Sequence, residues 1–493
     1  MTRQDSGPLG ADGTGLRRGA VRGFLVSALA FAGNRILVFA STLVLARLLV
    51  PEDFGIVAAG MTLILYLEIG LDLGVGAALV YEQETGISER AQTAFTLSVL
   101  TSLLFTAVGW WSAPAIASFF QVSGQETLFR VLFCYLLLRG LAQVPDALLR
   151  RDLRFGRRGV LDLARGLTRA SVATALALLG FGAWSIVWGL LAGEVVGTWL
   201  TWRATGFRPT FRIRRAAVRA LMGFGSAVFA LRLVDALATD GDYLVVGSQL
   251  GPTQLGFYSV AFRLPELLLL NVFWVFSSVA FPVYAKARAA TAGSPATAML
   301  GALRVVTLFG FSVGIALALL SRDAVLVLFS DRWEPAIAPM TLIALAAGVS
   351  SIGFASGDLF AALGRPGMLL AVNVPFTALM LVGFVLVVPY GLAAVAAVHL
   401  ASVLIDGVVR LALAHRLAGT RWADDLVAMW PAVCAAAGAL AVGLPVRLVL
   451  EPGPVALVCI AAAVTAGAGA GLFIGARPAL RDMTHLAREA LAR

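Results

Sequence analysis

Long apolar runs of about 20 residues follow one another along the chain from Phe24 onward, and short polar connections separate them. A helix of about that length crosses the hydrocarbon core of a bilayer. Backbone groups in hydrocarbon must be satisfied within the protein, and these runs are too long and too uniform for the strands of a membrane barrel. The pattern therefore predicts an integral membrane protein built from many helices.

We predict an all-α polytopic fold with about fourteen transmembrane helices. Their expected ranges are 23–49, 55–80, 91–118, 126–148, 159–180, 183–202, 220–249, 255–284, 301–327, 336–360, 368–389, 392–414, 427–446 and 454–475. The connections between them are short, so no domain outside the membrane is large enough to fold alone. Composition agrees, since 59% of residues are hydrophobic and 13% are charged, against about 25% charged in soluble domains.

The basic residues gather in alternate connections. Most of the 38 Lys and Arg residues lie in the N-terminal tail, the even-numbered loops and the C-terminal tail. The odd-numbered loops and their flanks hold only Arg322, Arg332 and Arg447. Cytoplasmic loops of membrane proteins are enriched in Lys and Arg, so both termini are expected in the cytoplasm. Because the net charge of +10 is spread over many loops, it does not predict nucleic-acid binding.

One short pattern occurs twice. Leu43–Val57 reads LVLARLLVPEDFGIV and Leu244–Tyr258 reads LVVGSQLGPTQLGFY, and the two align without a gap. The Pro and Gly shared by both copies are Pro51 and Gly55, Pro252 and Gly256. Pro fixes φ and Gly permits a reversal, so each copy predicts a helix–turn–helix hairpin. A hairpin found twice indicates an internal duplication.

The two hairpins are six predicted helices apart, so both cross the membrane in the same direction. Two six-helix lobes related by a pseudo-twofold axis along the membrane normal are therefore expected, followed by two further helices. The predicted parts are a cytoplasmic tail (1–22), an N-lobe (23–205), a basic linker (206–219), a C-lobe (220–415), the last two spans (416–475) and an amphipathic cytoplasmic tail (476–493).

Several arginines fall inside the apolar segments. The candidates for a cationic, substrate-binding cavity are Arg35, Arg139, Arg232 and Arg263. Each such charge costs about 2.5–3.5 kcal/mol on insertion scales, so it normally has a partner or a role. The planar guanidinium suits phosphate and carboxylate oxygens. Several deep arginines predict a site for an anionic headgroup such as a pyrophosphate, while the structural alternative is that each arginine pairs with an acid.

That alternative has local support. Asp162, Arg165 and Arg169 share one face of the segment 159–180, and Arg232 lies three residues before Asp235. Residues at such spacings are neighbours on a helix surface and can neutralise one another.

Several acids also fall within the predicted segments. The candidates are Glu68, Asp72, Asp235 and Asp240, with Asp242 on the same segment as the last two, while Glu194, Asp358 and Asp406 are isolated cases. Carboxylates on one face repel unless a cation, a proton or an arginine separates them. They are candidates for ion coupling or for salt bridges. No spacing specifies a metal site, and no cofactor is expected, although coupling to H⁺ or Na⁺ stays open.

The absence of known metal-binding and catalytic motifs argues against several classes of protein. Three cysteines (Cys134, Cys434, Cys459) and three histidines (His399, His415, His485) are too scattered for a disulfide framework or a zinc site. No metalloprotease, hydrolase, Walker or dinucleotide-binding motif is present. The chain is therefore not expected to be an enzyme.

Two stretches carry a resemblance to a known family. Ala46–Val80 and Asp242–Leu268 are similar to the signature hairpins of the polysaccharide transporter family, which includes the Wzx- and WzxC-like flippases of the multidrug/oligosaccharidyl-lipid/polysaccharide (MOP) superfamily. The resemblance implies translocation of an undecaprenyl-diphosphate-linked glycan from the inner to the outer leaflet of the bacterial plasma membrane by alternating access. The partners it implies are that lipid-linked glycan, membrane lipids, and glycosyltransferases or a polymerase of the same pathway.

Two alternatives remain at this stage. A cation-coupled drug antiporter of the multidrug-extrusion (MATE) type would have an acid-dominated cavity and usually twelve helices. A membrane glycan polymerase or glycosyltransferase would typically need a sizeable extracytoplasmic loop, which the predicted connections lack.

Overall fold

The computed structural model describes residues 32–72, 87–151, 155–211, 215–289, 295–364 and 366–477, and the regular elements in these ranges are all helices. Each predicted segment has a helical counterpart there, beginning with a helix at 32–48. Eleven stretches of the described chain are long and apolar enough to cross a membrane. One of them, Arg232–Tyr284, holds two predicted segments, and the charged helix α6 (Phe155–Leu178) is not among the eleven. The all-α polytopic fold is confirmed.

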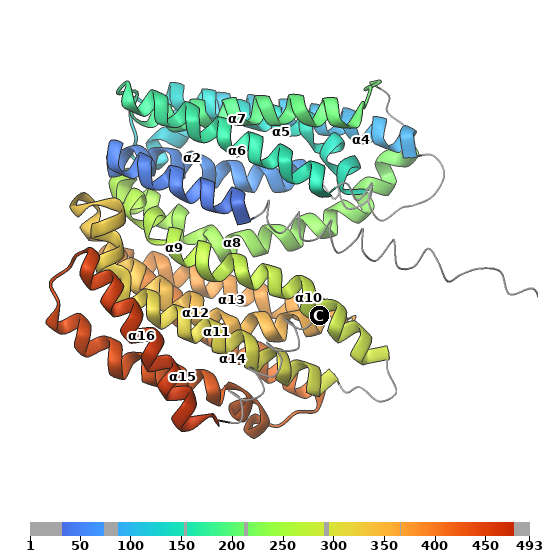
Figure 1. Cartoon of the computed structure of the whole chain (residues 1–493). Helices are drawn as coiled ribbons and strands as arrows, with labels where there is room; N and C mark the ends of the chain where they lie inside the picture. The colour runs from blue at the N-terminus through green and yellow to red at the C-terminus, as the bar shows by residue number, and fades with distance from the viewer. Residues whose placement is uncertain are drawn as a thin grey trace, which may run out of the picture. The chain divides into compact units, whose positions relative to one another are not determined.

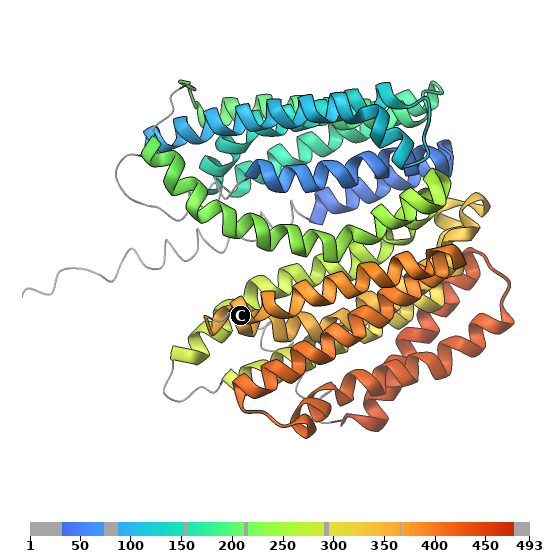
Figure 2. The ribbon, with the colours of Figure 1, turned by 180° about the vertical axis from the view of Figure 1, so that it is seen from behind.

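The chain forms two compact units, described separately here (Figures 1 and 2). Unit 1 comprises Met1–Leu49, Leu63–Phe119 and Ser123–Leu233, and unit 2 comprises Val50–Thr62, Phe120–Val122 and Val234–Arg493. The boundaries of lobes, linker and tails drawn from the sequence stay predictions. The predicted tails 1–22 and, from residue 478, the amphipathic tail lie outside the described residues.

Unit 1 is a bundle of long helices. Besides the helix at 32–48 and part of α2, it contains α4 (Ile87–Phe119), α5 (Glu126–Arg151), α6 (Phe155–Leu178) and α7 (Ala183–Thr205). Helix α4 packs on α5, α6 on α7, and α5 on α7 (Figure 1). Small residues permit the close approach, since a Cβ at Gly193 would press on the backbone carbonyl of Arg165.

Unit 2 holds the remaining helices, which follow one another along the chain. They are α8 (Arg215–Ala261) from Val234 on, α9 (Arg263–Pro265), the π-helix Glu266–Leu270, α10 (Asn271–Ala289), α11 (Pro295–Ala324), the π-helix Val325–Phe329, the 3₁₀ turn Asp331–Ala336, α12 (Ile337–Ala362), α13 (Pro366–Val387), the 3₁₀ turn Val388–Tyr390, α14 (Leu392–Ala418), α15 (Trp422–Val449) and α16 (Pro454–Gly475).

Small residues again set the helix contacts of unit 2. Helix α11 packs on α12 where Gly310 and Gly314 face Gly348, and α15 packs on α16 where Gly438 meets Gly467 (Figure 2). Without a hydrophobic driving force between helices in lipid, such close backbone packing is a main source of association. A cluster of buried apolar side chains in unit 2 includes Tyr284, whose hydroxyl donates to the carbonyl oxygen of Ala355 at 3.0 Å.

In both copies of the hairpin, the second helix begins at the shared proline. Pro51 is the first residue of α2 (Pro51–Asp72), and the Asp53 carboxylate accepts a hydrogen bond from the Val50 N–H at 3.2 Å. In the second copy α8 breaks at Gly251, whose φ of 80° and ψ of −179° are non-helical, and Pro252 starts the helix that follows. Pro suits the first turn of a helix because its missing N–H would have no partner there.

The shared glycines pack rather than turn. Gly55 and Gly256 both lie inside helices, while the second reversal falls at Gly251. A Cβ on Gly55 would collide with the carbonyl of Pro252, and a Cβ on Gly256 would collide with the carbonyl of Pro51. The two hairpins therefore touch each other reciprocally within unit 2, which explains why both copies need glycine at this position.

Candidate functional site

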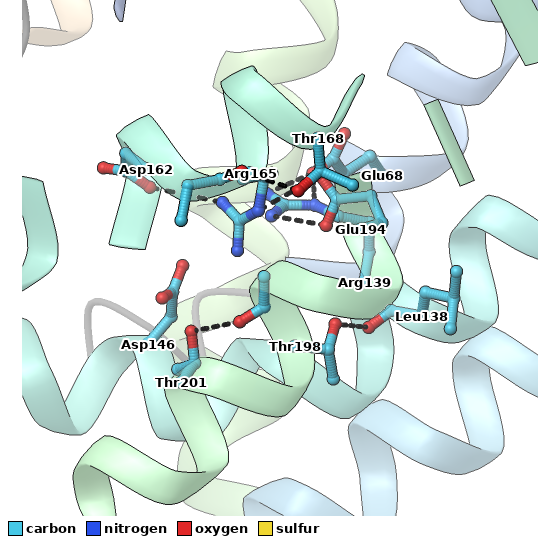
Figure 3. Close-up of polar contacts among 12 residues, drawn as sticks. Glu68, Leu138, Arg139, Asp146, Asp162, Arg165, Thr168, Glu194, Thr198 and Thr201 are labelled. Carbon is cyan, nitrogen blue, oxygen red and sulfur yellow. Dashed lines mark hydrogen bonds and ion pairs between the residues drawn. The ribbon is translucent and has the colours of Figure 1, made fainter. Parts of the chain in front are cut away.

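A chain of alternating charges crosses the inside of unit 1 (Figure 3). At its start Arg139 on α5 contacts Glu68 on α2, with Nε and Nη2 of the guanidinium each 2.7 Å from Glu68 Oε1. Arg139 Nη1 lies 3.9 Å from Oε2 of Glu194 on α7. One arginine thus joins three helices that are long and apolar enough to cross a membrane.

The chain continues through Arg165 on α6. Its Nε lies 3.5 Å from Glu194 Oε1, and its Nη1 lies 3.3 Å from Asp162 Oδ1 (Figure 3). Asp162 in turn lies 3.9 Å from Arg158 Nε. Gly197 on α7 leaves room for the Arg165 guanidinium, because a Cβ there would collide with it.

This linked set of side chains, called the ionic chain below, contains three arginines and three carboxylates, so its charges balance. Such balance is expected where low dielectric makes an isolated charge costly. Glu194 is only 9% exposed and Arg165 17%. Nε and Nη2 of Arg165 and Oε2 of Glu194 are buried and make no hydrogen bond within the described residues. Buried polar atoms without a hydrogen bond are rare in proteins, and the two Arg165 groups are N–H donors that could donate to an oxygen ligand.

The structure places the predicted arginines in different settings. Arg139 joins the predicted acid Glu68, and the local pairing expected for Asp162 with Arg165 is present. Arg263 lies 3.7 Å from Glu266, with both side chains about two-fifths exposed (39% and 40%). Arg35 is half-buried on the helix at 32–48, and Arg232 is exposed on α8. Their assignment to a substrate cavity stays a prediction.

The other predicted acids lie on two helices. Asp72 is the last residue of α2, and its side chain lies outside the described part of the structure. Asp235 and Asp240 lie on α8 in unit 2. Among the described residues no group of three His, Cys, Asp or Glu side chains is placed to hold a metal ion.

Unit 2 contains a cavity of about 390 Å³. Its polar lining includes the carboxylates of Asp235, Asp358 and Asp406, and aromatic side chains such as Trp274 form part of the wall. Within it, Arg410 Nε donates to Asp406 Oδ1 at 2.9 Å and Arg410 Nη2 donates to Asn373 Oδ1 at 3.1 Å. The Ser277 hydroxyl donates to Asp358 Oδ1 at 2.6 Å, while Asp358 Oδ2 is buried without a hydrogen bond in the described residues.

The sequence indicated Asp358, Asp406 and Glu194 only as isolated acids and did not indicate Arg410 as a site residue. Arg410 and Asp406 are four residues apart on α14, a spacing that signals a helical ion pair. Glu194 gave no such signal, because its partners Arg139 and Arg165 lie on other helices. His399 was grouped only with scattered histidines, yet it lines the cavity.

The described helices define a multi-pass membrane protein built as a bundle of long helices. The lipid II flippase MurJ in an inward closed conformation has a similar fold, with a TM-score of 0.73 at 14% identity over 90% of this chain and 98% of that chain. A crystal structure of MATE in complex with MaL6 is also similar, with a TM-score of 0.55 at 16% identity over 81% of this chain and 95% of that chain.

Residues 44–338, more than half of the chain, match the family described as polysaccharide biosynthesis protein, and the chain belongs to that family. It is 26% identical over 323 residues to the succinoglycan biosynthesis transport protein ExoT of Rhizobium meliloti (strain 1021), covering 66% of this chain and 65% of ExoT. It is 23% identical over 305 residues to the teichuronic acid biosynthesis protein TuaB of Bacillus subtilis (strain 168), covering 61% of this chain and 62% of TuaB.

The lipopolysaccharide biosynthesis protein WzxC of Escherichia coli (strain K12) is 22% identical over 333 residues, or 67% of each chain. The matches span less than two thirds of TuaB and of ExoT. The family match confirms the family predicted from the two hairpins, and the fold is shared with the solved flippase and MATE structures.

Proposed function

We propose that this protein moves an undecaprenyl-diphosphate-linked glycan from the inner to the outer leaflet of the bacterial plasma membrane. Membership of the polysaccharide biosynthesis family supports a role in moving polysaccharide precursors. The fold shared with the lipid II flippase MurJ supports a lipid-linked cargo. The observation that carries the proposal is the ionic chain of unit 1, in which Arg139 and Arg165 contact carboxylates of neighbouring helices and Arg165 retains buried donors without hydrogen bonds in the described residues.

The chemistry fits a diphosphate headgroup. A guanidinium presents a planar fork of donors that matches phosphate oxygens, and its charge does not depend on pH. In the absence of cargo, Glu68 and Glu194 contact part of the Arg139 guanidinium. An arriving diphosphate displaces a carboxylate from the arginines, so the charge of the headgroup is compensated inside the membrane. The exchange also explains why acids and arginines occur together.

Transport then follows by alternating access. The headgroup and its first sugars bind to the arginines while the polyprenyl tail stays in the lipid. The two predicted lobes close on one side of the membrane and open on the other, as parallel-repeat transporters do. Release of the headgroup restores the Arg139–Glu68 pair. Both termini lie in the cytoplasm in this scheme, and glycosyltransferases or a polymerase of the same pathway supply and consume the cargo.

The test is a flipping assay in vesicles containing the full chain and a fluorescent polyprenyl-diphosphate glycan. We expect protein-dependent movement of the glycan across the bilayer, and a strong reduction when Arg35 and Arg232 are both changed to Ala. Arg150→Gln is the matched control, because Arg150 pairs with Asp146 at 4.0 Å outside the ionic chain and its side chain is 49% exposed. Unchanged flipping in the double variant contradicts the assignment of Arg35 and Arg232, which lie outside the ionic chain. Unchanged flipping in Arg139→Gln combined with Glu68→Gln, or absence of flipping in the unaltered protein, contradicts the proposal.

A cation-coupled antiporter is the second candidate, and the acid-lined cavity of unit 2 favours it. Such a protein would expel cationic compounds in exchange for H⁺ or Na⁺. Efflux of an organic cation from the same vesicles, with no movement of the lipid-linked glycan, is the result that selects this alternative. Glycosyl transfer by the purified chain would overturn both transport hypotheses.

A further inference from the structure

A buried aspartate in unit 2 has an unusual set of partners. The side chain of Asp242 on α8 is 1% exposed. Its Oδ1 accepts the Tyr243 N–H at 2.9 Å, and its Oδ2 accepts the Tyr258 hydroxyl at 2.8 Å. His399 on α14 brings its Nδ1 to 3.4 Å from the same Oδ2.

The two hydrogen bonds do not neutralise the negative charge of the Asp242 carboxylate. A buried carboxylate is costly unless a positive partner or a proton neutralises it, and the two neutral donors supply no charge. Among the described residues, His399 is the basic side chain within ion-pair distance of Asp242. Nδ1 of His399 is itself buried and makes no hydrogen bond in the described chain. The two groups are therefore placed to share a proton.

The imidazole also faces the cavity. His399 is part of the cavity lining, and its ring lies between the rings of Phe262 and Phe384, with centroid distances of 5.6 and 6.3 Å. Other titratable or charged groups near it are Asp235, Asp240 and Asp242 on α8, Asp358 on α12, and Asp406 and Arg410 on α14. Arg263 on α9 and Glu266 on the π-helix that follows it also act on the buried residues around Asp242. Among these described groups carboxylates still outnumber the two guanidinium groups, so the surroundings favour arrival of a cation such as a proton.

We propose that His399 and Asp242 form the proton site that couples transport to a pH gradient. A proton from the cavity binds the imidazole at Nε2, and the imidazolium and the Asp242 carboxylate become a neutral ion pair. Release of that proton to the cavity leaves the pair with a net negative charge. The hydroxyl of Tyr258 donates to Asp242 in both states and holds the carboxylate in position. This inference rests on the proposed function.

The pair is connected to the duplicated hairpin. Tyr258 lies two residues after Gly256, the glycine that packs against the carbonyl of Pro51. A change of charge at Asp242 therefore reaches the contact between the two hairpins through one hydrogen bond. This connection gives protonation a direct path to the helices that the proposed transport cycle moves.

The chain supplies its own control. His415 Nδ1 lies 3.3 Å from Oδ2 of Asp425, which is also 1% exposed. This pair lies near the junction of α14 and α15, where His415 stacks on Trp422 and its Nδ1 is 3.1 Å from the Thr420 hydroxyl. Neither member lines the cavity. The control pair has similar chemistry and burial without access to the cavity, so it should not couple to transport.

The first experiment measures the flipping of a polyprenyl-diphosphate glycan in vesicles with and without an imposed pH gradient. We expect the gradient to change the initial rate of the unaltered protein. In His399→Gln and Asp242→Asn the ratio of the two rates falls to one, whereas His415→Gln keeps the ratio of the unaltered protein. A normal ratio in His399→Gln, or a response of the unaltered protein to a sodium gradient but not to a pH gradient, overturns the proposal.

The second experiment does not depend on flipping. Nitrogen-15 NMR of histidine-labelled full-length protein follows the rings of His399, His415 and His485, with His399→Gln used for assignment. We expect the ring signals of His399 to respond to pH, and Asp242→Asn to alter that response curve without altering the curve of His415. A His399 signal that ignores pH overturns the proton site. If this curve is seen while the unaltered protein flips no glycan, the proton site stands and the proposed function fails.

Discussion

The ionic chain of unit 1 and the cavity of unit 2 use the same residue types in opposite ways. In unit 1 the charges are linked across four helices, and one helix approaches them closely: Gly197 fits next to Arg165 only because it has no side chain. In unit 2 the carboxylates line open space of about 390 Å³, and a Cβ added at Gly353 would meet nothing closer than 3.8 Å.

The difference separates two roles. A close-packed chain with balanced charges fixes positively charged forks in position, which suits the binding of a large anion. An open cavity with excess carboxylates can admit a small cation or a proton and respond to it. One protein can therefore hold its anionic cargo in one region and take up its driving ion in another.

The largest effect is expected from breaking the ionic chain. Arg139→Gln leaves Glu68 and Glu194 without their shared counter-charge, and we expect a loss of about 3–5 kcal/mol in the free energy of unfolding. The double variant Arg139→Gln with Glu68→Gln removes one charge of each sign and should recover most of that loss. Thermal unfolding in detergent measures both. A single variant as stable as the unaltered protein would show that the chain is not a linked unit.

A smaller effect is expected at the glycine beside the chain. Gly197→Ala forces the Arg165 guanidinium away from Glu194, and we expect a cost of about 1–3 kcal/mol, as for other overpacked sites. The comparison of unfolding curves tests this. Stability equal to that of the unaltered protein would mean that the guanidinium can move aside freely.

In the cavity of unit 2, Ser277→Ala removes the hydroxyl that donates to Asp358 Oδ1 at 2.6 Å. We expect a cost of about 1 kcal/mol, the usual net value of one hydrogen bond. The effect should stay below that of Gly197→Ala, because water can enter the open cavity and replace the hydroxyl. A loss equal to that of Arg139→Gln would remove the distinction between the two regions.

The smallest effect is expected for Gly353→Ala on α12. The nearest atoms to the added methyl group, at 3.8 Å, belong to Arg410 and Asp406. We expect a change within about 0.5 kcal/mol, or a gain, because Ala favours the helix over Gly. Thermal unfolding measured beside Gly197→Ala gives the matched pair, and a large loss here would show that the cavity is as tightly packed as the ionic chain.

Much of the fold was predictable from local patterns. The apolar runs gave the helices because their length is set by the membrane, and the duplicated hairpins gave the family. The sequence assigned the second reversal to the shared Gly256, whereas it falls at Gly251, whose φ is 80°. Gly251 precedes Pro252, and the residue before a proline is disfavoured in a helix, so a local signal for this position was present.

The candidate sites were predictable only where partners share a helix. Asp162 with Arg165, and Asp406 with Arg410, follow from spacings of three and four residues. Arg139 and Glu68 are 71 residues apart and on different helices, so the sequence named both without pairing them. The same holds for His399 and Asp242, which only the packing of α14 against α8 brings together.

The central claim is that the arginines of unit 1 have two roles: they bind the headgroup of the cargo, and they stabilise the packing of the helices. Flipping of a polyprenyl-diphosphate glycan by the double variant Arg139→Gln with Glu68→Gln tests it most directly, because that variant is expected to fold while lacking one guanidinium fork. We predict that the variant reaches near-normal stability and still flips the glycan far more slowly than the unaltered protein or Arg150→Gln. Full recovery of flipping together with stability would contradict the claim and leave the ionic chain a purely structural role.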